Sequence, residues 1–179
     1  VIMGLITVWW EKVHQGTSGG LFKFTLVERL LILSRAFWFY LEKLIAPRQL
    51  AFSYPQWDIQ PGDPAQYVPV VALIAVGIVL WLRRQHARGL AAAAVFFFIV
   101  LAPMLGVFSM WTFRYTYVAD HYQYLACLGP MAWFAAMVMR LKGSAWRVSA
   151  SAVILAALCT LSFLYARVYK NPETIWRDV

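Results

Sequence analysis

Four long apolar runs, separated by short polar segments, give the strongest structural signal along this chain. A helix needs about 20 predominantly apolar residues to cross the hydrocarbon core of a bilayer, and each run approaches that length. We therefore predict a spanning helix over each of residues 67–82, 90–108, 122–139 and 148–166. A further apolar run at the start of the sequence, residues 1–10, is too short to span a membrane by itself. We expect it to be the outward end of a truncated transmembrane helix.

A fifth apolar segment, residues 26–46, carries a stripe of charge. Glu28, Arg35 and Glu42 are spaced by seven and share one face of a helix. Such a helix could lie flat at the membrane surface, or it could span with Arg35 near mid-depth. We favour spanning, because the stripe covers well under half of the circumference and the next helix must run inward. The predicted fold is therefore all-α, a polytopic integral membrane bundle of about five spanning helices.

The amino-acid composition supports an integral membrane protein and argues against a soluble nucleic-acid-binding protein. The chain is 62% hydrophobic and only 13% charged, whereas a soluble domain carries about a quarter charged residues. The net charge of +8 would suggest a nucleic-acid partner in a soluble protein. Here the basic residues gather in two short turns without acids, at 83–88 and 140–147, so no nucleic-acid partner is expected.

The two basic turns also set the predicted orientation. By the positive-inside rule they are cytoplasmic, which makes the loops 47–66 and 109–121 and the C-terminus periplasmic, in a bacterial inner membrane. The Pro- and Gly-rich segment 47–66 is expected to be an ordered outward loop. Residues 11–166 form the predicted membrane domain. Residues 167–179 form a predicted outward tail leading into a repeat domain, because "NPETIW" is a helix-start signal.

The candidate chemistry lies at the outward start of the 122–139 run. Asp120 and His121 offer an acid and a titratable imidazole, and both are candidate catalytic residues. Alternatively, Asp120 is an acid favoured by the helix dipole and His121 an interfacial side chain. Arg114 and Tyr124 complete a group that could hold a phosphate, although cation–π stacking would also explain Arg114.

Arg35 is the third candidate for phosphate binding. An arginine at mid-depth is unfavourable unless it has a partner or a task, so we expect either a carboxylate partner, such as Glu28 or Glu42, or a lipid phosphate. Cys127 and Cys159 fit no metal motif and are expected to be small apolar residues within their helices. No cofactor or metal is predicted.

Three stretches resemble a known family. "LILSRAFWFYLEKLIAPRQLAFSYPQWDI" looks like the arginine-bearing helix and following loop of large membrane glycosyltransferases fused to tetratricopeptide repeats, whose eukaryotic members are protein O-mannosyltransferases of the transmembrane-and-tetratricopeptide-repeat family. "VADHYQYLACLGP" resembles the acid-Arg-Tyr-x-Tyr-Leu-Pro-Ser signature of that family. "YKNPETIWRDV" resembles the junction with its first repeat. Two departures stand out, His121 in place of Arg and Ala126-Cys127 in place of Pro-Ser.

The resemblance implies a C-type glycosyltransferase that moves a sugar from a polyprenyl-phosphate carrier to a protein or glycan acceptor on the periplasmic or lumenal face. It matches Asp120 to the signature acid, and Tyr122 and Tyr124 to its tyrosines. It also places the catalytic aspartate of the family in an earlier outward loop, so this chain alone is expected to be inactive. The expected partners are the lipid-linked sugar, membrane lipids and the acceptor. The alternative is a non-catalytic membrane anchor or accessory subunit packed against other membrane subunits.

Overall fold

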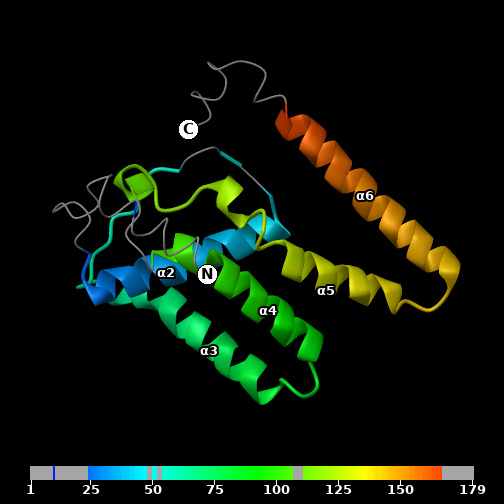
Figure 1. The fold of residues 1–179 in the computed structure, drawn as a ribbon, viewed down its shortest axis with the longest axis horizontal. Helices are drawn as coiled ribbons and strands as arrows, with labels where there is room; N and C mark the ends of the chain where they lie inside the picture. The colour runs from blue at the N-terminus through cyan, green and yellow to red at the C-terminus, as the bar shows by residue number, and fades with distance from the viewer. Residues whose placement is uncertain (1–9, 11–23, 48–49, 52–53, 107–110, 167–179) are drawn as a thin grey trace.

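The computed structural model describes residues 10, 24–47, 50–51, 54–106 and 111–166, and this part of the chain is helical, with no strand (Figure 1). The predicted all-α class is thus confirmed. The described part of the chain contains five α-helices and four short 3₁₀ turns. The α-helices are α2 (Leu26–Ile45), α3 (Val68–Leu82), α4 (Arg88–Leu101), α5 (Leu128–Met139) and α6 (Ser144–Ala166). The 3₁₀ turns are η2 (Pro64–Tyr67), η3 (Ala102–Leu105), η4 (Trp111–Arg114) and η5 (Asp120–Gln123).

Local sequence explains where the first two described helices begin. The Thr25 hydroxyl accepts a hydrogen bond from the Glu28 backbone N–H, and the Glu28 carboxylate accepts one from the Thr25 N–H at 2.7 Å. This reciprocal capping box fixes the start of α2 one residue after Thr25. Asp63 caps η2 in a similar way by accepting from the Ala65 N–H at 3.0 Å. Pro64 then occupies the first position, where a missing N–H has no consequence.

The predicted helix 90–108 is interrupted at its far end. α4 stops at Leu101 and continues only as the 3₁₀ turn η3, which Gly106 ends with φ of +90°. Pro103 explains the change, because its ring cannot donate a hydrogen bond and collides with the carbonyl four residues earlier in an α-helix. Residues 107 and 108 of the predicted range lie outside the described residues.

The predicted start of the 122–139 helix is wrong. Residues 120–123 form the 3₁₀ turn η5, residues 124–127 are turns, and α5 begins only at Leu128. Pro130 gives the reason, since proline is tolerated in the first turn of an α-helix but not in its interior. α6 in turn starts earlier than predicted, at Ser144. Gly143, with φ of +92°, makes the tight turn that separates it from α5.

Three segments are long and apolar enough to cross a membrane, rather than the five predicted. They are Pro64–Leu82, Arg88–Leu105 and Ser144–Leu164. α5 is a shorter apolar helix of 12 residues, about 18 Å at about 1.5 Å per residue. α2 is long enough, but its charges keep it out of this group. The truncated helix predicted over 1–10 and the tail 167–179 lie outside the described residues, apart from exposed Trp10.

The buried core lies at one end of the helices, which we call the cap end; the end at turns 83–87 and 140–143 is the basic end. The cap consists of α2 with residues 54–67 and 111–127. Phe37 of α2 contacts Phe97 and Phe98 near the end of α4, and the Trp38 indole donates to the Pro69 carbonyl in the first turn of α3. These contacts place α2 against the cap ends of α3 and α4 (Figure 1). Such packing favours the flat-lying interpretation of α2.

α6 is nearly without contacts in the described structure. The helix joins the rest at the turn after α5 and then runs apart from the other helices (Figure 1). None of its apolar window is buried. Among its exposed large side chains are Val153 and Leu155.

Candidate functional site

Asp120 is held inside the cap by residues of the 47–66 loop. The Tyr54 hydroxyl lies 3.0 and 3.1 Å from the two carboxylate oxygens and donates to them. The Ala51 backbone N–H donates to the same carboxylate at 2.9 Å. The carboxylate therefore joins two loops that are far apart in the sequence. This is a different structural role from the helix-dipole acid expected from the sequence, because Asp120 begins a 3₁₀ turn rather than α5.

The residue before Asp120 is fixed by α2. The fully buried Tyr40 hydroxyl accepts a hydrogen bond from the Ala119 N–H at 3.1 Å and contacts the Ala119 carbonyl at 3.4 Å. Two residues further upstream, the side chain of Tyr117 packs edge-on against Phe24 and Phe113. The segment that carries the candidate acid is therefore held by α2 on one side and by the 47–66 loop on the other.

Burial raises the pKa of Asp120 above its ordinary value. The hydrogen bonds from Tyr54 and Ala51 and the nearby charges of Lys43 and His121 act in the opposite direction, but burial is the larger effect. A carboxyl group in this position holds its proton more tightly than one in water. The direction suits a proton donor, whereas the hydrogen bonds show that the carboxylate already has partners within the chain.

Lys43 brings a positive charge into the same region. Its side chain is buried, and the Nζ atom lies 5.3 Å from the ring centre of Phe39 and 5.2 Å from that of Tyr54. Both distances are within the range of cation–π attraction. The ring of Tyr54 also packs edge-on against Phe39 at 4.8 Å. Lys43, Tyr54 and Asp120 thus form one cluster of cation, phenol and acid.

Arg35 lies two helical turns before Lys43 and is exposed. Its guanidinium stacks over Trp57, 4.7 Å from the ring centre. No carboxylate of the described residues pairs with it, so neither Glu28 nor Glu42 is the partner that the sequence suggested. Trp57 packs in turn against Phe39 and Tyr117, which links Arg35 to the Lys43 cluster through aromatic rings.

The remaining candidates lie at the surface of the cap. Arg114 is exposed, with its guanidinium 6.0 Å from the ring centre of its neighbour Tyr115, which agrees with the stacking interpretation. His121 is exposed and packs edge-on against Tyr122 at 4.4 Å. Tyr124 is exposed as well, in the turn before α5. These side chains share one end of the molecule.

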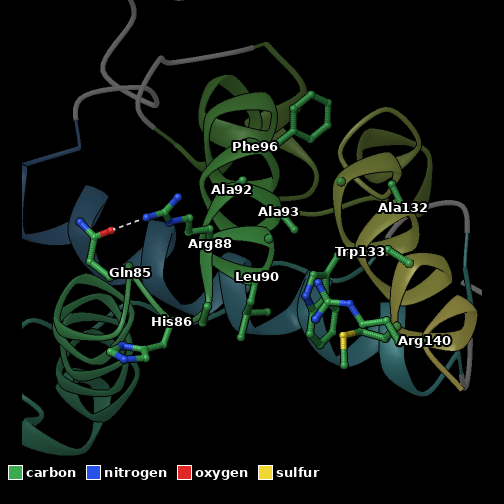
Figure 2. A pocket seen from close by; sticks show the side chains of 15 residues that line it. Gln85, His86, Arg88, Leu90, Ala92, Ala93, Phe96, Ala132, Trp133 and Arg140 are labelled. Atoms are coloured by element: carbon green, nitrogen blue, oxygen red, sulfur yellow. Dashed lines mark hydrogen bonds between the residues drawn. The ribbon is translucent and has the colours of Figure 1, made fainter. Parts of the chain in front are cut away.

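Two cavities in the described part of the chain lie away from the cap. The larger, of about 810 Å³, is a groove between the start of α4 and α5 at the basic end (Figure 2). The smaller, of about 530 Å³, lies beside Met139, Arg147 and Leu155. Within the same described residues, no group of three potential metal ligands is present. Cys127 is buried and Cys159 exposed, and both are free thiols.

Three residues that shape the cap were not among the sequence candidates for chemistry: Lys43, Tyr54 and Trp57. The spacing of Arg35, Phe39 and Lys43 by four places them on successive turns, which was a usable signal. Tyr54 and Trp57 read only as interfacial aromatics, because nothing local shows that a ring in a loop folds back onto a helix.

Comparison with known proteins adds no relative: no family model, no curated protein and no solved structure matches the chain.

Proposed function

We propose that this chain is a membrane domain that binds a polyprenyl-phosphate-linked sugar at the cap, as part of a glycosyltransferase acting on the periplasmic or lumenal face. The observation that carries the proposal is the environment of Arg35, an exposed guanidinium held over Trp57 without a carboxylate partner among the described residues. An arginine oriented by an aromatic ring keeps its planar fork of donors for a phosphate.

Membrane insertion is the first step of the argument. α3 and α6 expose long rows of Val, Ile, Leu and Phe, far beyond the patches that a soluble monomer shows. Lipid acyl chains are the natural cover for such helices. The basic end carries Arg83, Arg84, Arg140 and Lys142, which by the positive-inside rule faces the cytoplasm and turns the cap outward.

The location of α2 is the second step. A helix packed over the cap ends of α3 and α4 lies near the depth of lipid headgroups, so Arg35 meets a phosphate there without crossing the hydrocarbon core. This is also the less unfavourable position for its charge. The carrier phosphate would bind to Arg35, and the polyprenyl chain would extend along the exposed apolar faces of the helices.

The cap residues are assigned to binding and positioning. In the proposed transfer, an acceptor hydroxyl oxygen forms a bond to the anomeric carbon and its proton passes to the catalytic aspartate that the resemblance places in an earlier outward loop. The bond from the anomeric carbon to the phosphate oxygen breaks, and polyprenyl phosphate leaves. Arg35 stabilises the negative charge that develops on this leaving group. Asp120 already accepts hydrogen bonds from Tyr54 and Ala51, so we assign it to holding the cap together rather than to proton removal.

The test uses the full-length protein and sugar transfer from the lipid-linked donor. Arg35→Ala is expected to abolish transfer while leaving expression and membrane integration unchanged, and Arg35→Lys to restore only a small part. Arg84→Ala is the matched control, because Arg84 also stacks on a tryptophan, Trp81 at 3.9 Å, but at the basic end. Wild-type transfer by Arg35→Ala would remove this arginine from the mechanism.

A non-catalytic anchor or accessory subunit is the second candidate function. It is favoured by the internal hydrogen bonds of Asp120, which give this carboxylate partners within the chain. In that case the exposed faces of α3 and α6 would be covered by partner helices. Purification of the protein without any partner subunit, with transfer activity intact, would reject this alternative.

A further inference from the structure

The groove between α4 and α5 has the form of a site for one amphipathic molecule. Its volume of about 810 Å³ lies within the range of small-molecule sites, about 300–1,000 Å³. It is open along one side, and its lining divides into a polar rim at the basic end and an apolar interior (Figure 2).

Small residues create the groove. Near its closed end the two helices touch: a Cβ on Gly129 of α5 would come within 2.7 Å of the Phe96 ring and 3.1 Å of the Ala93 carbonyl of α4. One turn along, Trp133 covers Gly89, where a Cβ would lie 3.2 Å from the indole. These contacts show that the helices run antiparallel. Towards the basic end the lining includes alanine and glycine from both helices, together with the larger side chains of Leu90, Trp133 and Met137.

The rim is positively charged. Arg88 and Arg140 line the groove from the two helices, and His86 lies beside them. Arg88 donates to the Gln85 amide oxygen at 2.9 Å, and its side chain extends toward Gln85 on the side of α4 away from α5 (Figure 2). No Asp or Glu occurs in residues 83–106 or 128–166. No acidic side chain of α4, α5 or α6 therefore neutralises the positive charge of the rim.

From this juxtaposition of a cationic rim and an apolar interior, we propose that the α4–α5 groove binds one anionic phospholipid. Its phosphate lies at the basic rim lined by Arg88 and Arg140, and an acyl chain packs over Phe96, Ala132 and Trp133. Basic pockets between transmembrane helices on the cytoplasmic side attract acidic headgroups in this way. A guanidinium group binds a phosphodiester through charge-assisted hydrogen bonds.

The proposal depends on the membrane insertion argued above but not on the glycosyltransferase activity, because the groove and the cap occupy opposite ends of α4. Insertion is therefore checked first, by retention of the full-length protein in the membrane fraction after alkaline carbonate extraction. Loss from that fraction would overturn both proposals. If the protein is retained in the membrane but has no transfer activity, the lipid site is still tested by the experiment that follows.

The test is native mass spectrometry of the full-length protein released from detergent with phosphatidylglycerol or phosphatidylcholine added. We expect retained phosphatidylglycerol adducts and at least tenfold weaker retention of phosphatidylcholine. Arg88→Gln with Arg140→Gln is expected to reduce the phosphatidylglycerol adducts about tenfold. Arg83→Gln with Lys142→Gln is the matched control, since these residues carry the same charge at the same end without lining the groove.

A second variant separates a built site from diffuse attraction to a basic surface. Ala136→Phe fills the groove from exposed Ala136 without changing any charge, and it is expected to abolish the adducts as well. Equal loss in the Arg83/Lys142 control, equal retention of the two lipids, or unchanged adducts in both groove variants would each overturn the proposal. Soluble glycerol phosphate, which lacks acyl chains, is expected not to displace the lipid, and displacement would also overturn it.

Discussion

Tyr54 and Asp120, 66 residues apart in the sequence, are joined by a hydroxyl that donates to both carboxylate oxygens at 3.0 and 3.1 Å. The contact fastens the loop before α3 to the segment before α5. With the Tyr40–Ala119 pair it holds three separate stretches of chain in one cap. The arrangement at Arg35 and Trp57 depends on this fastening, because Trp57 lies in the same loop three residues after Tyr54.

Tyr54→Phe is therefore expected to destabilise the protein by about 1–3 kcal/mol, because it leaves a half-buried carboxylate with one donor fewer. The control is Tyr124→Phe, which removes an equivalent hydroxyl from an exposed ring and should change stability by less than about 0.5 kcal/mol. Unfolding of the detergent-solubilised protein measures both. Equal stability of the two variants would contradict the anchoring role of Asp120.

The raised pKa of Asp120 predicts the direction of a pH effect. The native state holds this proton more tightly than the unfolded chain does, so the contribution of Asp120 is most favourable below the unfolded value of about 3.9. It is lost as the pH rises through the folded pKa. Asp120→Asn should remove this part of the dependence when thermal unfolding is followed from acid to neutral pH.

Tyr54→Phe offers an internal check on the same effect. The Tyr54 hydroxyl favours the ionised carboxylate, so its removal should raise the folded pKa further and extend the loss of stability to higher pH. A shift to lower pH would show that the Tyr54 hydroxyl does not favour the ionised carboxylate.

How far sequence alone predicts the structure differs between the helices and the cap. The runs of apolar residues predicted the approximate positions of the helices, since a long apolar run is a strong helix signal. The start of α5 was missed because the apolar run begins before Pro130, and the proline limits the helix more strongly than the composition does. For α2, the pattern favoured a spanning helix, whereas its contacts with Phe97 and Pro69 favour a flat-lying one.

The site was predicted in part. Asp120 and Arg35 stand out because ionisable residues are rare in such a chain, but the partner of each is a loop aromatic distant in sequence. Long-range pairs of this kind leave no periodic signal. The groove between α4 and α5 could not be predicted from the sequence either, since it depends on small residues of two helices meeting in register.

The close approach of α4 and α5 gives a packing prediction. Gly129→Ala places a methyl group 2.7 Å from the Phe96 ring and 3.1 Å from the Ala93 carbonyl, and is expected to destabilise by about 1–3 kcal/mol. Gly77→Ala is the matched control in α3, where nothing lies within 4 Å of the new methyl group. That change should be neutral or stabilise by up to about 1 kcal/mol. Equal stability of the two variants in thermal unfolding would mean that α4 and α5 are not in contact at Gly129.

The native thiols give a test of membrane insertion. Cys159 is exposed in the described structure, 15 residues after the start of α6 and thus about 22 Å along it at about 1.5 Å per residue. If α6 spans, lipid surrounds this thiol, and the reactive thiolate does not form in hydrocarbon. We expect neither Cys159 nor buried Cys127 to react with a membrane-impermeant maleimide in intact membranes, and both to react in sodium dodecyl sulfate. Rapid labelling of Cys159 in intact membranes would show that α6 does not span.

Because the native thiols are expected not to react with the maleimide, introduced cysteines can report the orientation of the protein in the membrane. Gln85→Cys lies in the exposed turn at the basic end, and Asp58→Cys is exposed in the cap. With the positive-inside orientation, Asp58→Cys should react from the outside of intact cells, and Gln85→Cys only after the membrane is permeabilised. The reverse pattern would place the cap in the cytoplasm. Arg35 would then face the wrong side for a periplasmic or lumenal transfer, whereas the α4–α5 groove would keep its fold but lose its cytoplasmic lipid partner.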